Sequence, residues 1–118
     1  MTLAVNDPCV AVLRQAVPEF ESVFERENLA EDGALDAFAA VSSFADFVRL
    51  RTQSGDWTLV SRATGAVEWL LADDSAERQL ARPLAVEFLE AVAGDRALVA
   101  RLGPLGRDWQ AVHQGDER

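Results

Sequence analysis

The chain has 118 residues, of which 49% are hydrophobic, and it carries a net charge of −9 at neutral pH, which indicates one globular domain over residues 1–118 rather than a disordered acidic chain. A single Cys excludes a disulfide scaffold and a multi-cysteine zinc site, and no apolar run approaches the roughly 20 residues that a membrane span requires. The acidic balance argues against nucleic acid as a partner, because neutralising phosphates needs a positive face.

Two helices are predicted near the N-terminus. Asp7 and Pro8 form a helix start, since Asp can cap a helix and Pro at the first helical position loses no needed hydrogen bond. Pro18 disfavours helical geometry at the residue before it, so the first helix should end or bend there. A second helix should follow over residues 18–30.

The most apolar element is a third helix, expected from about Ala34 to Arg51. Its apolar residues lie on more than one side of a helical wheel, which is typical of a central helix with neighbours on both flanks. Phe38 and Phe44 share its broad apolar face. We expect both of them, and Phe88 of a later helix, to lie in the core.

The segment from Trp57 to Ala72 is compatible with two structures. Trp, Thr and Val favour strands, and Thr64-Gly65 could turn a hairpin. Helical periodicity favours a helix, because most of the apolar residues fall within one arc of roughly 140° on a wheel, whereas a strand would mix apolar and polar residues on both faces. That arc holds Leu59, Val60, Ala63, Ala66, Val67, Leu70 and Leu71.

The next helix begins with a capping signal and contains a proline. Asp74 and Glu77, three residues apart, resemble a capping box. Pro83 lies inside the helix that follows, so we expect a kink or a break near Arg82.

Two short helices are expected at the C-terminal end. Asp95 should cap a helix from Arg96 to Leu102, and Gly103-Pro104 is a strong stop. A last helix, from about Leu105 to Val112, should dock Trp109 against the core.

These elements predict an all-α fold, a single compact bundle of six to seven helices joined by short loops. Residues 1–5 and 114–118 should be frayed. The N-terminus lacks the basic region and the long apolar run of a signal peptide, and a free Cys suits a reducing compartment. We therefore expect a cytoplasmic protein.

Candidates for catalysis and for metal binding are few. Cys9 lies in the first turn of a helix, but pairing it with His113 would require the two ends of the chain to meet. The adjacent Asp73 and Asp74 could hold a cation, although helix capping explains them as well. The run from Gly103 to Gly106 lacks the lysine and the glycine spacing of a phosphate loop. We expect no catalytic residues, no metal and no cofactor.

Charge and one tryptophan suggest a protein-binding surface. Glu21 and Glu25 of the second helix and Asp32 just after it fall within about 40° of one another on a helical wheel and form an acidic stripe. Trp57 and Trp69 both lie outside the apolar arc of their helix, and Trp69 lies near Arg62 on the wheel. Trp is typical of interface hot spots. The alternatives are that the charge keeps the protein soluble and that each Trp packs against another helix. The candidate partner-binding residues are Glu21, Glu25, Asp32, Trp69, Asp73 and Asp74.

Four runs of the sequence resemble a family of small, uncharacterised bacterial all-helical proteins. The runs are Val17-Pro-Glu-Phe20, Ser43-Phe-Ala-Asp-Phe-Val48, Leu84-Ala-Val-Glu-Phe-Leu-Glu-Ala-Val92 and Leu102-Gly-Pro-Leu105. The resemblance spans residues 17–106 and implies a helical fold. Small acidic domains of this kind are often immunity proteins that neutralise a toxin, an association of families rather than a property of these residues.

We therefore expect a non-catalytic, acidic protein-binding domain, namely a bacterial immunity or antitoxin-like protein. Its partner would be a basic protein, for instance a toxin domain, and the chain itself would be a monomer or a weak homodimer. The alternatives are a regulatory or accessory subunit of a cytoplasmic enzyme complex, and a homo-oligomeric helical protein of unknown role.

Overall fold

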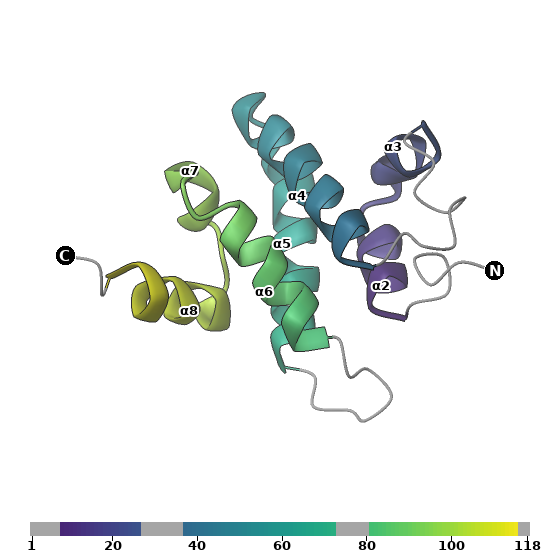
Figure 1. The fold of residues 1–118 in the computed structure, drawn as a ribbon. Coiled ribbons are helices and arrows are strands. Elements are labelled where there is room, and N and C mark those ends of the chain that lie inside the picture. The colour runs from purple at the N-terminus through teal and green to yellow at the C-terminus, as the bar shows by residue number, and fades with distance from the viewer. Residues whose placement is uncertain (1–7, 27–36, 73–80, 116–118) are drawn as a thin grey trace.

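The computed structural model describes residues 8–26, 37–72 and 81–115. Over these ranges the chain forms seven α-helices and one 3-10 turn, and it contains no strand (Figure 1). The expected all-α class is therefore confirmed for the described part of the chain.

The chain breaks at Pro18, as predicted. α2 (Pro8–Ala16) begins at the expected proline and ends two residues before Pro18. A 3-10 turn, η1 (Pro18–Phe20), and a separate helix, α3 (Glu21–Arg26), stand where we expected one continuous helix. The first turn after the proline is tightened, since the N–H of Phe20 donates to the carbonyl of Val17 at 3.0 Å.

The next helix, α4 (Ala37–Gln53), extends two residues beyond the expected end at Arg51. It ends in a Schellman motif, in which the N–H of Asp56 donates to the carbonyl of Arg51 at 3.0 Å and that of Gly55 to Thr52 at 3.1 Å. Gly55 has a φ of 80°, which a residue without a Cβ adopts readily. Asp56 then caps the following helix by accepting the N–H of Leu59 at 3.3 Å.

The segment that was compatible with a hairpin is helical throughout. α5 (Trp57–Ala72) passes through Thr64-Gly65 without a turn, and the hydroxyl of Thr64 donates to the carbonyl of Ser61. The arc predicted from periodicity is the face that the helix buries. Its buried residues are Leu59, Val60, Ala63, Thr64, Ala66, Val67, Leu70 and Leu71.

The three remaining helices are α6 (Ala81–Ala91), α7 (Arg96–Val99) and α8 (Pro104–Gly115). Pro83 is the third described residue of α6. The residues before Ala81, on which a break near Arg82 depends, lie outside the described ranges.

The last two helices, α7 and α8, end at other residues than expected. Asp95 caps α7 as predicted, but α7 ends at Val99 rather than Leu102, because the chain tightens into turns in which Leu102 donates to the carbonyl of Val99 at 3.1 Å. α8 continues past Val112 to Gly115, so the two residues 114–115 that we expected to be frayed are helical.

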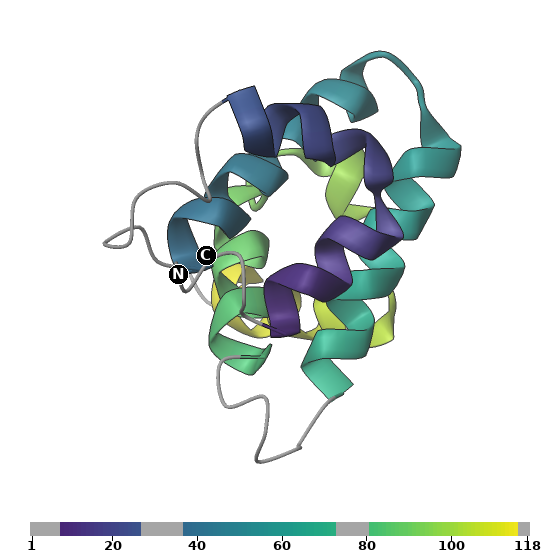
Figure 2. The same cartoon turned by 90° about the vertical axis from the view of Figure 1, so that its right-hand side faces the viewer.

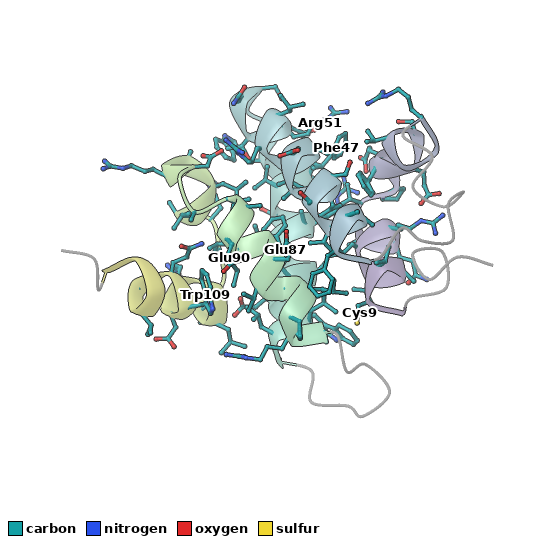
Figure 3. The ribbon with its side chains drawn as sticks, in the orientation of Figure 1. Cys9, Phe47, Arg51, Glu87, Glu90 and Trp109 are labelled. Carbon is teal, nitrogen blue, oxygen red and sulfur yellow. The ribbon has the colours of Figure 1, made fainter. Side chains whose placement is uncertain are left out.

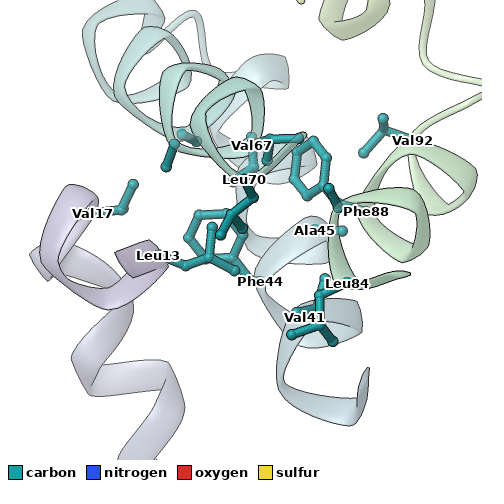
Figure 4. Close-up of a cluster of buried hydrophobic side chains, with 14 of the residues drawn as sticks. Leu13, Val17, Val41, Phe44, Ala45, Val67, Leu70, Leu84, Phe88 and Val92 are labelled. Atoms are coloured by element: carbon teal, nitrogen blue, oxygen red, sulfur yellow. The ribbon is translucent and has the colours of Figure 1, made fainter. Parts of the chain in front are cut away.

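The core lies where α4, α5 and α6 pack together (Figure 4). Phe44 and Phe88 are fully buried, with ring centroids 5.9 Å apart, and Phe20 meets Phe44 edge-on at 5.2 Å. The prediction for Phe38 was wrong, because this residue lies in the first described turn of α4 and is only half-buried against the core.

Two helices cover opposite sides of this core. α2 packs across α5 and α4 and lies at the front of the view in Figure 2. α8 packs on the other side, against α5 and α6 (Figure 1). Trp109 is buried, as predicted, and lies on the side of α8 that faces α6 (Figure 3).

Candidate protein-interaction surface

The first residue of the predicted acidic stripe has a partner within the chain. Glu21 opens α3, and both of its carboxylate oxygens accept hydrogen bonds from Arg14 of α2, from Nε and, at 2.8 Å, from Nη2. Such a bidentate pair is stronger than a single hydrogen bond. The hydrogen bonds from Arg14 hold the pKa of Glu21 below its usual value. Glu21 therefore joins α2 to α3 across the break at Pro18.

A second carboxylate in the same region is also paired. Glu19 of η1 accepts hydrogen bonds from Arg62 of α5 at 2.7 and 3.2 Å, and Arg62 also donates to the carbonyl of Ala16 at 3.3 Å. The hydrogen bond from Arg62 lowers the pKa of Glu19. Because Ala16 is the last residue of α2, Arg62 satisfies a helix end and a carboxylate at once. Arg62 thereby links the end of α2 and η1 to α5.

Most of the other predicted acidic residues lie outside the description. The backbone of Glu25 belongs to α3, but its side chain is not among the described ones, and Asp32, Asp73 and Asp74 fall between the described ranges. The described ranges hold ten carboxylates and nine arginines, and the rest of the chain holds ten carboxylates and two arginines. Almost all of the net charge of −9 therefore belongs to residues outside those ranges.

Trp69 is exposed and Trp57 is not, although both lie outside the apolar arc of α5. Trp69 leaves 46% of its surface accessible, on the same helix face as Arg62 and Gly65. Nothing lies within 4 Å of the Cβ position at Gly65, so this face is open beside the tryptophan. Trp57 instead packs against the core, with the guanidinium of Arg101 4.1 Å from its ring centroid.

A polar side chain that we did not single out positions α8. Glu68 of α5 accepts the backbone N–H of Leu105 and, at 3.0 Å, that of Gly106. These are two of the N-terminal N–H groups of α8, which have no partner inside the helix. The Glu68 carboxylate occupies the place that a bound anion would take at the start of a helix. The N-terminus of α8, at residues 103–106, is therefore already filled by a side chain of the same protein.

A shallow groove separates α3 from α4. It has a volume of about 350 Å³, and its lining includes the half-buried Phe47 and the exposed Leu50. The guanidinium of Arg51 lies over the Phe47 ring, 5.0 Å from its centroid (Figure 3). The groove carries opposite charges at Arg26 and Asp46. Its lining holds no His or Cys and a single carboxylate, so it does not form a catalytic or metal-binding group of side chains.

The comparisons with known protein families, with curated proteins and with solved structures found no match to this chain.

The described residues do not assemble a chemical site of the kinds considered from the sequence. Cys9 is buried at 1% exposure, inside α2, as a small core residue. Among the described residues, no group of three or more His, Cys, Asp and Glu side chains could hold a metal ion. None of the helices in the described ranges is long and apolar enough to cross a membrane.

The residues that we missed all join separate helices. Arg14, Arg62 and Glu68 find partners that are distant in sequence or lie beyond a helix break. One signal for Glu68 was present: Gly103 precedes α8 where a capping side chain is usual, so the N–H groups that follow need an acceptor from elsewhere. No comparable signal pointed to the pair of Glu19 and Arg62.

Proposed function

We propose that this chain is a non-catalytic domain that binds a basic protein partner. The exposure of Trp69 is the observation that carries the proposal, because close to half of a large aromatic surface remains in water. Burying about 100 Å² of that surface in an interface would stabilise a complex by roughly 2.5 kcal/mol. Trp in such a position is typical of the anchors that dominate interface affinity.

The negative charge of the chain indicates that its partner is positively charged. A chain at −9 attracts a positively charged protein and speeds its encounter, and salt screens this effect. Because Glu19 and Glu21 are paired internally, we assign the attraction mainly to other carboxylates. Asp73 and Asp74 are among them, and they follow α5 directly in the sequence, close to Trp69.

We further propose that the partner is a toxin and that the chain is a bacterial, cytoplasmic immunity or antitoxin-like protein. This finer proposal is supported by the small size and acidity of the domain and by the four sequence runs that resemble an uncharacterised bacterial helical family. It is an association between classes of protein, whereas the exposed Trp69 is a feature of this chain.

Affinity capture with matched variants tests both levels of the proposal. The wild-type chain, Trp69→Ala and Leu50→Ala are immobilised and exposed to a lysate of the source cells. Leu50 is the control, since it is 63% exposed on a different helix. We expect one basic protein to be retained by wild type and Leu50→Ala, to be lost from Trp69→Ala, and to elute as salt is raised.

The captured protein then decides the finer proposal. We expect it to arrest growth when expressed alone and growth to be restored by wild type, but not by Trp69→Ala. Equal retention by all three forms, or no retention, would overturn the binding proposal. A partner that is harmless when expressed alone would overturn the immunity proposal only.

A further inference from the structure

α8 carries two of the four large hydrophobic side chains that are exposed in the described ranges. Leu105 is 45% exposed and Val112 is 50% exposed. With Asp108 and Trp109 they are spaced i, i+3, i+4 and i+7, so all four lie on one stripe of the helix. This stripe is distinct from the face of α5 that carries Trp69.

The stripe borders a pocket of about 180 Å³, whose lining exposes more polar than apolar surface. Leu71 of α5 and Arg82 of α6 complete its lining beside the α8 residues. Leu105 and Val112 can serve as knobs on the rim, while Leu71 and Trp109 form an apolar floor that is already mostly buried. The patch therefore combines two exposed aliphatic side chains with a pocket to which Arg82 and Asp108 contribute polar surface.

The patch carries two opposite charges that form no ion pair with each other or with other described residues. Arg82 and Asp108 are both exposed and line the same pocket, yet neither forms an ion pair within the described ranges. Some other charged groups of the described ranges are paired within the chain, such as Glu21 with Arg14 and Glu19 with Arg62. The patch is thus locally neutral in a chain that is strongly acidic overall.

We propose that this patch binds a second copy of the chain, in a two-fold symmetric dimer. In such an interface the same surface is used twice, so Arg82 of each copy meets Asp108 of the other, and two ion pairs form. Two antiparallel α8 helices also bring Leu105 of one copy opposite Val112 of the other. A locally neutral patch is where two chains of charge −9 can approach with the least repulsion.

The small area of the patch limits the affinity of the dimer. α8 has 12 residues and is therefore about 18 Å long, so one face of it buries less than a standard interface does. We expect a reversible dimer with a Kd in the micromolar range. The proposal is independent of the function assigned to Trp69, since Trp69 does not line this pocket.

Sedimentation velocity with charge-swap variants tests the proposal. The full chain, of 12.9 kDa, should shift toward twice that mass as its concentration rises from about 5 to 500 µM. Asp108→Arg and Arg82→Asp should each raise Kd at least tenfold, because each places like charges across the interface. The double variant Arg82→Asp/Asp108→Arg should return Kd to within about threefold of wild type.

Two further variants separate the apolar contact from a general effect. Val112→Ser should raise Kd at least tenfold, whereas Leu50→Ser, an exposed position on α4, should leave it unchanged. A wild-type chain that stays monomeric over the whole range would overturn the proposal. So would a dimer that Asp108→Arg leaves intact, or a double variant that does not recover.

Discussion

The carboxylate of Glu68 in α5 accepts the backbone N–H of Gly106 at 3.0 Å and thereby closes the start of α8. Its other oxygen accepts the N–H of Leu105. In the middle of α8, Gln110 donates from Nε2 to the carbonyl of Leu89 at 2.8 Å, near the end of α6. α8 is therefore held by polar contacts to two different helices as well as by the burial of Trp109.

Removing the Glu68 side chain should destabilise the protein. Glu68→Ala leaves two N–H groups at the start of α8 without their acceptor, and we expect the free energy of unfolding to fall by about 0.5–2 kcal/mol, as for the loss of a helix cap. Glu68→Gln keeps an acceptor but loses the charge at the helix start, which is worth about 0.3–1 kcal/mol. Urea denaturation measures both, with Glu90→Gln on the exposed face of α6 as the control. A midpoint for Glu68→Ala equal to that of the control would contradict this account.

Gly103 and Gly65 should respond in opposite directions to alanine. A Cβ at Gly103 would lie 2.6 Å from Cδ of Glu68, so Gly103→Ala must displace the carboxylate and destabilise the protein. At Gly65 nothing lies within 4 Å, and Gly65→Ala within α5 should stabilise by about 0.5–1 kcal/mol. In a Glu68→Ala background the cost of Gly103→Ala should largely disappear. Additive costs would show that the two residues are not coupled.

The helical structure of residues 57–72 was predictable because the evidence for it is local. The apolar residues of α5 repeat with the period of a helix, and burial of one face follows from that period alone. The end of α4 was predictable to within two residues for a similar reason, since Gly55 and Asp56 carry turn chemistry in themselves.

Contacts between helices were not predictable in the same way. Glu19 and Arg62 are 43 residues apart, and their pairing depends on how α2 docks against α5. A helical wheel places Glu21 on an outward face, but it does not include Arg14, which lies on the preceding helix beyond Pro18. The wheel likewise assigned Phe38 to the apolar face of α4 without showing how much of that face its neighbours cover.

The lowered pKa of Glu21 predicts a pH dependence of stability. Because the pKa in the folded state lies below its ordinary value of 4.5, the pair stabilises the protein above about pH 4.5, and this contribution is lost as the pH falls through the folded pKa. Arg14→Ala should move the Glu21 pKa up toward its ordinary value in a carboxyl NMR titration. The stability difference between wild type and Arg14→Ala should vanish at low pH, with the exposed Arg26→Ala as the control. An unchanged Glu21 titration in Arg14→Ala would refute the pairing.

Phe44 and Phe38 should differ strongly when truncated. Phe44 is fully buried between Phe20 and Phe88, so Phe44→Ala should cost about 3–5 kcal/mol and leave the protein barely folded. Phe38→Ala should cost clearly less, because Phe38 is only half-buried. Urea midpoints of the two variants measure the difference, and equal losses would contradict the placement of the core.

The rate at which the complex dissociates tests the central claim, that Trp69 anchors a basic partner, most directly. With the purified partner in a surface binding assay, Trp69→Ala should dissociate at least tenfold faster than wild type and associate at nearly the same rate, since a buried anchor acts on the dissociation rate and charges act on the association rate. Leu50→Ala should behave as wild type, and raising salt should slow association in all three forms. A folded Trp69→Ala variant that dissociates at the wild-type rate would contradict the claim.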